Sequence, residues 1–296
     1  MISVIITSFK EPKTIGKAIE GFLNQDLKEK YEIIVSAPDK ETLDVAKSYT
    51  KKNKIVKTFQ DPGKGKMFAL NLLFSKVKGD ILVLSDGDIF VKENSIKYLV
   101  DLFKDPKIGC ATGRVVSSDS RKTMLGYWSH LLCDAGAHQA RLKRFKKGQF
   151  LECSGYLWAF RNHVVKNFPL DVPEDAIVPY YFMKKSYKIG YAPNAIVYVS
   201  YPKNLHDFID QKKRTTKAHA QMSKYINLKD YPKTKTFKNE LFESYRAFLY
   251  PKNFKEIIWT FILFPVKLYI WGLSIYHVKV AKKFHTDAWK TPKSTK

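Results

Sequence analysis

The sequence predicts an α/β fold in which helices flank a mainly parallel central sheet. Three observations carry this prediction: short apolar runs rich in Val and Ile, helical segments with one apolar face, and a regular alternation of the two. Strands that alternate with helices form right-handed βαβ units, so the strands lie parallel. Ligands of such a sheet bind at the carboxyl ends of its strands.

The first half of the chain alternates most regularly. Residues 2–7 form the first expected strand, because the run is short, apolar and rich in β-branched residues. Residues 14–25 follow as a helix whose apolar side chains share one face. The alternation continues with expected strands at 31–36, 54–59 and 80–86 and expected helices at 41–49 and 66–77.

After about residue 105 the alternation loosens. No internal repeat or Gly/Ser linker divides the chain, so we expect one domain over residues 1–230, with halves at about 1–115 and 116–230. A tail of different composition occupies residues 231–296. In the second half we expect strands at 108–116 and 189–200 and helices at 122–145, 173–187 and 205–225.

The tail contains an apolar stretch at residues 257–276, roughly long enough to cross a bilayer. Its Trp and Tyr residues are typical of a membrane interface, and lysines flank it on both sides. A spanning helix would put the basic residues after 276 opposite the cytosolic domain, against the positive-inside tendency, whereas an in-plane helix keeps both flanks on the anionic leaflet. Spanning, in-plane and protein-packed arrangements all remain open, and the first two mean membrane association.

The charge of the chain is strongly positive. Lys and Arg total 52 against 28 Asp and Glu, which gives a formal net charge of +24. Such a balance indicates a polyanionic partner, although a Lys-rich composition bias could also produce it. Only seven of the cations are Arg, and Lys rarely makes the bidentate base contacts of sequence-specific recognition. We therefore expect phosphate groups or an anionic membrane surface as partners, and no nucleic acid.

The cysteines and the N-terminus bear on localisation. The three cysteines lack metal-ligand spacing and are an odd number, which argues against a disulfide framework and favours a reducing compartment. The apolar run at residues 2–6 is too short for a secretory signal. We expect a membrane-associated protein with its catalytic domain on the cytoplasmic face.

The fourth expected strand ends in Asp86-Gly87-Asp88. Two carboxylates on a strand-end turn can share a hard divalent cation with a phosphate ligand, and the glycine lets the backbone come close to that ligand. An acidic surface turn is the alternative for such a short motif.

Five further motifs accompany this one in order, and each alone is weak. The six motifs are Ser8-Phe9-Lys10-Glu11 after the first strand, Gly65 to Asn71, Asp86-Gly87-Asp88, Glu152-Cys153-Ser154-Gly155 running into Ala159-Phe160-Arg161, Pro173-Glu174-Asp175, and Phe208 to Arg214. Together they resemble family 2 inverting glycosyltransferases of the GT-A (Rossmann-like) fold, over roughly residues 1–220. The resemblance implies a GT-A sheet flanked by helices, and the apolar composition of the tail predicts that hydrophobic or amphipathic membrane helices follow it.

The resemblance implies a nucleotide-sugar half at about 1–115 and an acceptor half at about 116–230. Asp86 would contact the nucleoside diphosphate, and Asp88 would ligate Mn²⁺ or Mg²⁺. Many relatives carry an Asp-rich turn where Ala37 stands, so Ala37 offers backbone groups only, with Asp39 as a substitute. The nucleotide-binding set implied by the resemblance is Thr7, Ser8, Glu11, Ala37, Lys66 and Asp86.

Asp175 would be the general base by the same resemblance. Inverting transfer needs a group that removes the proton of the acceptor hydroxyl, while cations stabilise the departing diphosphate. Asp175 could instead cap the helix that follows it, and Glu174 could be a helix-end residue. The residues expected to border the acceptor and diphosphate are Gly155, Glu174, Gln211 and Arg214.

The sequence thus predicts a metal-dependent glycosyltransferase that moves one sugar from a nucleotide-sugar donor, UDP-linked more than GDP-linked. The expected acceptor is lipid-linked or a saccharide at the membrane surface. Processive synthases of the family carry Trp where Thr215 stands, so an aromatic platform for a growing chain is missing and single transfer is favoured. A processive polysaccharide synthase is the alternative enzyme, and a nucleic-acid-binding protein is the non-enzyme alternative.

Overall fold

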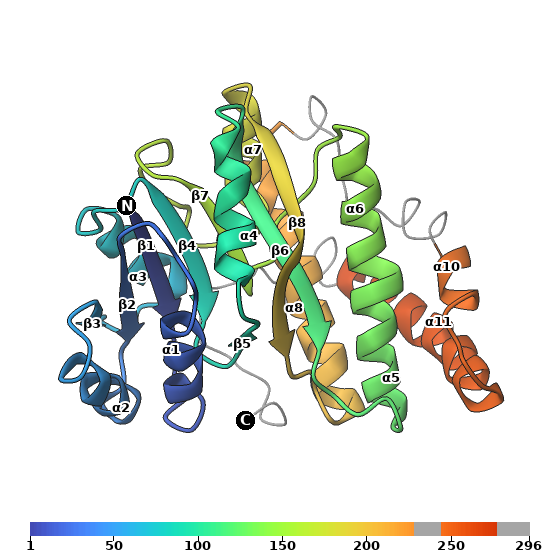
Figure 1. Ribbon diagram of the computed structural model, residues 1–296. Coiled ribbons are helices and arrows are strands. Elements are labelled where there is room, and N and C mark those ends of the chain that lie inside the picture. Colours follow the sequence, from blue (N-terminus) through green and yellow to red (C-terminus); the bar gives the residue numbers. More distant parts are fainter. Residues whose placement is uncertain (228–243, 277–296) are drawn as a thin grey trace.

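The computed structural model describes residues 1–227 and 244–276. Within these residues a central eight-stranded sheet has the order β3-β2-β1-β4-β7-β6-β8-β5 (Figure 1). The strands are β1 (Ile2–Thr7), β2 (Tyr31–Ala37), β3 (Val56–Gln60), β4 (Ile81–Asp86), β5 (Phe90–Val91), β6 (Ile108–Ser117), β7 (Leu157–Arg161) and β8 (Lys188–Val199).

Helices cover both faces of this sheet. The α-helices are α1 (Ile15–Leu23), α2 (Lys40–Thr50), α3 (Lys66–Phe74), α4 (Ser95–Asp101), α5 (Met124–Leu131), α6 (Gln139–Lys146), α7 (Glu174–Lys184), α8 (Leu205–Gln221), α10 (Tyr245–Phe248) and α11 (Phe254–Ile275). A π-helical segment, η2 (Leu132–His138), joins α5 to α6, and short 3₁₀ turns are η1 (Leu102–Lys104) and η3 (Met222–Lys224). Side chains from α1, α2 and α4 pack into the core on one face of the sheet, and side chains from α3 and α7 pack into the core on the other.

The predicted α/β class with a mostly parallel sheet is confirmed. Strands β3, β2, β1 and β4 run parallel, and β6 runs parallel to β8. Strand β7, however, lies antiparallel between β4 and β6, and β5 pairs antiparallel with β8. The sequence did not predict the two-residue β5 or helix α4, and the direction of β7 depends on tertiary pairing that a short apolar run does not encode.

The register of the central strands forms a row of polar residues at one edge. Thr7 at the end of β1 lies opposite Ser36 of β2 and Asp86 of β4. All of β1 is buried, as expected for a parallel strand covered on both faces. The sheet therefore places the carboxyl ends of β1, β2 and β4 side by side, where ligands of an open α/β sheet bind.

Helix α11 packs along the outside of α5 and α8 (Figure 1). The Tyr127 hydroxyl lies 2.6 Å from the Thr260 hydroxyl, and the indole N–H of Trp128 donates to the Trp259 carbonyl at 2.7 Å. Within the described residues, α11 is the one helix long and apolar enough to cross a membrane, over Phe254–Leu273. The basic residues after 276 in the predicted tail lie outside the described residues.

An ion pair fixes the start of α11 to the segment before α5. Arg121 donates to both carboxylate oxygens of Glu256, at 2.7 and 2.9 Å, and Glu256 is buried. Bidentate, charge-assisted contacts of this kind are among the stronger hydrogen bonds in proteins. The hydrogen bond from Arg121 holds the pKa of Glu256 below its ordinary value.

Docking of α11 is expected to weaken in acid. Because the folded pKa of Glu256 is depressed, its contribution is complete above the ordinary Glu pKa of about 4.3 and is lost as the pH falls through the folded value. Hydrogen exchange at pH 6 and pH 3.5 should show the protection of α11 amides falling by about tenfold more than that of α3 amides. Glu256→Gln should remove this difference, and equal losses in the two helices would contradict the prediction.

Candidate active site

The turn after β4 carries the two carboxylates that the sequence singled out. The Thr7 hydroxyl lies 3.3 Å from Asp86 Oδ1 and 3.3 Å from the Ser85 carbonyl oxygen. The Asp86 side chain is partly exposed, with 28% of its surface accessible. Asp86 therefore sits at the sheet edge, anchored by its neighbour strand and open to a ligand.

Gly87 is needed between the two acids because the segment that follows β1 approaches it closely. A Cβ atom on Gly87 would lie 2.3 Å from Ser8 Oγ and 2.8 Å from Glu11 Oε2. The Ser8 hydroxyl donates to Glu11 at 2.7 Å, and both residues are buried. Ser8 and Glu11 thus form a polar floor beneath the Asp86-Gly87-Asp88 turn.

Lys66, the first residue of α3, links the end of β4 to the start of α7. Its Nζ lies 2.7 Å from Asp86 Oδ1 and 2.9 Å from Glu174 Oε1. Only 17% of the Lys66 side chain and 4% of the Glu174 side chain are exposed. The sequence analysis named all three as candidate site residues. In the structure Lys66 contacts both carboxylates, although Glu174 lies more than 100 positions further along the chain.

The ionisation of this triad follows from its burial and its charges. Burial alone would lower the pKa of Lys66, but the Asp86 and Glu174 carboxylates outweigh it and hold the pKa well above its usual range. Burial raises the pKa of Glu174; Lys66 opposes this rise, and the neighbouring Asp175 adds to it. Lys66 is thus a permanent cation at the place where Asp86 faces the site.

Asp175 stands in the first turn of α7, beside the loop that leads into β7. Its Oδ2 accepts a hydrogen bond from the Gly155 N–H at 2.7 Å. Pro173 is the N-cap residue of α7, so this bond ties the Asp175 carboxylate to another segment and not to its own helix. A Cβ on Gly155 would lie 3.3 Å from the same oxygen, which explains a glycine here.

Helix α8 carries Gln211 and Arg214, and the charge of Arg214 acts on Tyr156 of the same loop. Burial raises the pKa of Tyr156, the Asp88 and Asp86 carboxylates add to the rise, and Arg214 opposes it. The charges of Asp86, Asp88 and Arg214 therefore all act on the Tyr156 hydroxyl. Gln211 Oε1 is buried and has no hydrogen-bond donor among the described residues.

The end of β2 carries two candidate nucleotide-binding residues, Ala37 and its suggested substitute Asp39. Ala37 is buried at the end of β2. Asp39 accepts hydrogen bonds from the backbone N–H groups of Thr42, as the N-cap of α2, and of Lys10, at 3.0 and 2.8 Å. Asp39 is thus engaged in holding two backbone segments together.

Asp61 is a candidate site residue that the sequence analysis missed. It follows β3 directly, it is 3% exposed, and its carboxylate lies 3.3 Å from the Ser36 hydroxyl at the end of β2. Burial raises the pKa of Asp61. Its position directly after an expected parallel strand could have identified it, because ligands bind at such strand ends. The Pro and Gly that follow it, however, are typical of an ordinary turn.

The donor set of the turn fits a hard divalent cation. Among the described residues no group of three or more His, Cys, Asp or Glu side chains forms a complete metal site. Mg²⁺ and similar cations are commonly held by one or two carboxylates together with substrate phosphates. Asp86 and Asp88 supply such carboxylates at an open strand end, so they fit a metal that shares its coordination with a diphosphate.

Comparison with known proteins now decides the family. A family model described as "Glycosyltransferase like family 2" matches residues 1–218. The chain belongs to glycosyltransferase family 2. The roles of the individual site residues stay predictions.

Individual relatives are distant. A dolichyl N-acetyl-α-D-glucosaminyl phosphate 3-β-D-2,3-diacetamido-2,3-dideoxy-β-D-glucuronosyltransferase of Methanococcus voltae is 29% identical over 38% of this chain and 38% of its own length. Poly-β-1,6-N-acetyl-D-glucosamine synthase of Staphylococcus aureus is 24% identical over 91% of this chain and 64% of its own. The chain spans about half the length of the curated relatives it matches.

A solved structure confirms the fold at low sequence identity. The mannosyltransferase PcManGT from Pyrobaculum calidifontis, in complex with GDP-Man and Mn²⁺, aligns with a TM-score of 0.58 and 16% identity. The alignment covers 95% of this chain and 81% of that one. The glycosyltransferase thus has a GT-A-like fold.

Proposed function

We propose that this glycosyltransferase moves one sugar, with inversion at the anomeric carbon, from a UDP-sugar to an acceptor held at a membrane surface. The observation that carries the proposal is the Lys66 bridge between Asp86 and Glu174. It ties the strand end that faces the donor diphosphate to the helix whose next residue is Asp175. Donor-side and acceptor-side groups therefore belong to one site.

Cationic side chains of the chain itself would stabilise the leaving diphosphate. Lys66 is held protonated beside Asp86, and Arg214 lies within electrostatic reach of the Tyr156 hydroxyl between Asp88 and α8. Cations positioned where negative charge develops lower the barrier to transfer. When bound at Asp86 and Asp88, Mn²⁺ or Mg²⁺ would supply Lewis-acid stabilisation of the same charge.

Asp175 is the proposed base. The Gly155 N–H binds its Oδ2 and so fixes the orientation in which the carboxylate would meet an incoming hydroxyl. As that hydroxyl oxygen attacks the anomeric carbon, its proton would pass to Asp175 and the bond to the diphosphate would break. Glu174 is buried against Lys66 and is assigned a positioning role.

A donor screen tests the function. Nucleoside diphosphate release should require Mn²⁺ or Mg²⁺ and should be fastest with a UDP-sugar. Asp88→Asn should lower release by about 100-fold or more, because a bound metal contributes several kcal/mol to such a transition state. Metal-independent release, or an Asp88→Asn variant with wild-type rates, would contradict the assignment, provided that thermal unfolding shows an intact fold.

A processive polysaccharide synthase is the second candidate function. The relative named poly-β-1,6-N-acetyl-D-glucosamine synthase matches 91% of this chain, which favours it. Thr215 stands one residue after Arg214, where a polymer-binding aromatic residue is expected, and this favours single transfer. Sizing the product made from labelled donor separates the two candidates.

The proposed membrane contact is the outer face of α10 and α11. Leu249 between them is 79% exposed, and the same face presents several large apolar side chains. Exposed apolar patches of this kind mark protein or membrane contacts. The apolar residues exposed on α10 and α11 include Phe248, Phe254, Ile257, Ile258, Phe261, Ile262 and Leu268.

The docking of α11 supports an in-plane arrangement over a spanning one. Glu256 near its start and Ile270 near its end are both buried against the catalytic body. A helix held to the protein at both ends lies along the domain, with its exposed face free to enter the headgroup region. The catalytic domain is proposed to lie on the cytoplasmic face, where its three free, buried cysteines would stay reduced.

Membrane binding is expected to depend on this face. The double change Leu249→Glu and Phe261→Glu should lower binding to vesicles of anionic phospholipid by tenfold or more, since it puts two charges into the apolar contact. Tyr98→Glu, at an exposed aromatic residue on α4, is the matched control and should bind as wild type. Equal co-sedimentation of both variants with the vesicles would exclude α10 and α11 as the contact.

A further inference from the structure

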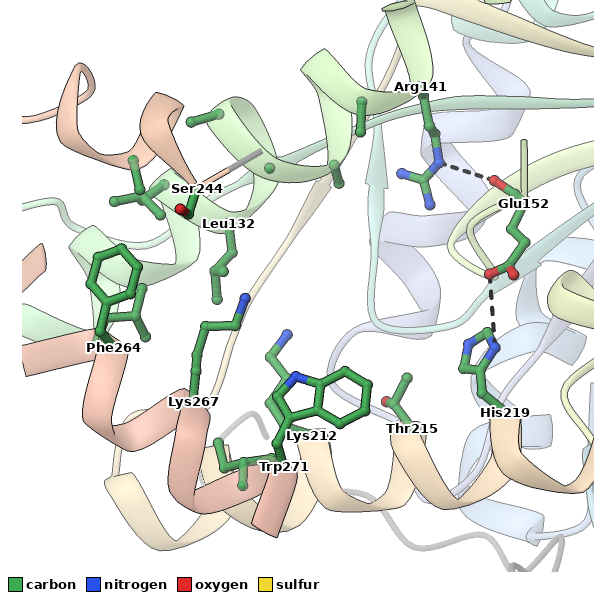
Figure 2. A pocket seen from close by; sticks show the side chains of 18 of the residues that line it. Leu132, Arg141, Glu152, Lys212, Thr215, His219, Ser244, Phe264, Lys267 and Trp271 are labelled. Carbon is green, nitrogen blue, oxygen red and sulfur yellow. Dashed lines mark hydrogen bonds and ion pairs between the residues drawn. The ribbon is translucent and has the colours of Figure 1, made fainter. Parts of the chain in front are cut away.

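A cavity of about 410 Å³ lies between η2, α6, α8 and α11 (Figure 2). Its size is in the range of pockets that bury small organic ligands. Leu132 comes from η2, Phe264 and Trp271 come from α11, and Thr215 comes from α8. The cavity belongs to neither the nucleotide edge of the sheet nor the Asp86 turn, so the donor site does not account for it.

One end of the cavity reaches the loop that holds the proposed base. Glu152 lines it and stands three residues before Gly155, whose N–H bonds Asp175. His219 Nδ1 lies 3.8 Å from Glu152 Oε2 at the same end (Figure 2). Thr215 directly follows Arg214 on α8. Glu152 therefore links this end of the cavity, through residues 153–155, to the segment that bonds Asp175.

The other end is formed by the helix that carries the proposed membrane face. Leu263 and Ile270 of α11 are buried and line the cavity. Phe261 and Ile262 of the same helix are exposed on its outer surface. The cavity thus lies between the apolar helix at the molecular surface and the segment at residues 151–152.

The cavity combines apolar walls with positive charge. Among its described lining residues are four cations and one carboxylate, Glu152. Within the described part of the chain, the guanidinium groups of Arg141 and Arg144 bond to backbone carbonyls of residues 150–153, which leaves their charge in place. Figure 2 shows Lys212 of α8 and Lys267 of α11 with their amino groups directed into the space below η2.

We infer that this cavity binds an amphipathic lipid with a phosphate in its head group, and that this lipid carries the acceptor hydroxyl. The hydrocarbon chain packs between η2 and α11, and the phosphate lies among Arg141, Lys212 and Lys267. The inference rests on the proposed function and names its acceptor class. A hydroxyl beyond the phosphate would reach Asp175, lose its proton there and bond to the anomeric carbon as the nucleoside diphosphate leaves.

Titration of the full chain with farnesyl phosphate tests this inference. Farnesol, which lacks the phosphate, and inorganic phosphate, which lacks the hydrocarbon chain, are the comparison ligands. Gly136→Phe fills the cavity, since a Cβ at Gly136 meets only the Leu131 carbonyl oxygen, at 3.9 Å. Gly272→Phe is the matched control on α11, where a Cβ meets no atom within 4 Å. Lys212→Gln removes one charge and leaves the apolar side chains of the cavity wall unchanged.

The expected result is that farnesyl phosphate binds at least tenfold more tightly than either comparison ligand. Gly136→Phe should weaken it tenfold or more, Lys212→Gln should weaken farnesyl phosphate but not farnesol, and Gly272→Phe should match wild type. The inference would be overturned if inorganic phosphate bound as tightly as farnesyl phosphate. It would also be overturned if Gly136→Phe and Lys212→Gln both bound farnesyl phosphate as tightly as the wild type does.

A parallel titration with UDP and Mn²⁺ keeps the two proposals apart. If every variant binds UDP but the wild type does not bind farnesyl phosphate, the inferred lipid site is wrong and the proposed UDP-sugar function still stands. Absence of UDP binding to the wild type defeats the proposed UDP-sugar function, whatever the lipid titration gives. Thermal unfolding of Gly136→Phe reports whether the variant is folded, and Lys212→Gln carries the test if it is not.

Discussion

Asp175→Asn is expected to lower sugar transfer by about 100-fold or more, because a positioned base contributes at least that factor. Asparagine is nearly isosteric and keeps a carbonyl oxygen that can accept the hydrogen bond from the Gly155 N–H, now 2.7 Å from Asp175 Oδ2. The loop and α7 should therefore keep their positions. Only the capacity to take a proton is removed, so the loss should fall on turnover and not on binding of UDP with Mn²⁺.

Asp44→Asn provides the matched control. Asp44 is an exposed residue of α2 that pairs with Lys40, and it is not among the candidate site residues. It should transfer sugar at the wild-type rate. If Asp175→Asn also retained near-wild-type turnover, Asp175 would be a structural ligand of the Gly155 loop and another group would have to be the base.

Lys66→Met is expected to destabilise the fold by about 3–5 kcal/mol, the usual cost of removing one member of a buried ion pair. Glu174 is 4% exposed and would be left without its cation, and Asp86 would lose a partner at 2.7 Å. Burial already raises the pKa of Glu174 and Lys66 is the group that opposes the rise, so the variant should raise it further. The destabilisation should therefore be largest at neutral pH and shrink as acid protonates Glu174.

Urea unfolding at pH 7 and pH 5 measures both parts of this prediction. Lys66→Arg should recover much of the lost stability because it keeps a cation between the two carboxylates. Lys40→Met, which removes an exposed partner of Asp44, should change stability little. A Lys66→Met variant as stable as wild type at pH 7 would mean that the bridge does not hold β4 and α7 together.

The sequence predicted the site best where polar residues directly follow a recognisable strand. The acids of the Asp86-Gly87-Asp88 turn follow a buried strand, so their place at the sheet edge could be predicted from the order of residues alone. The contact of Lys66 with Glu174 could not, because it depends on how α3 and α7 pack across the sheet. Asp61 was missed for a related reason: only the register of β2 and β3 reveals that it faces Ser36.

The helical tail shows the same limit. Its apolar composition predicted a membrane segment, but composition does not say which side of a helix meets protein. The contacts of Thr260 with Tyr127 and of Glu256 with Arg121 are long-range pairings that no local pattern encodes. The cavity beside Lys267 arises from this packing, so it became visible only once α8 and α11 were placed together.

The anomeric configuration of the transferred sugar tests the central claim most directly. A single displacement in which Asp175 deprotonates the acceptor while the diphosphate departs inverts the anomeric carbon. Transfer from an α-linked UDP-sugar, read from the anomeric proton coupling of the product by NMR, should therefore give only the β-linked product. An α-linked product would mean retention of configuration, which a single back-side displacement cannot give, and it would contradict the role assigned to Asp175.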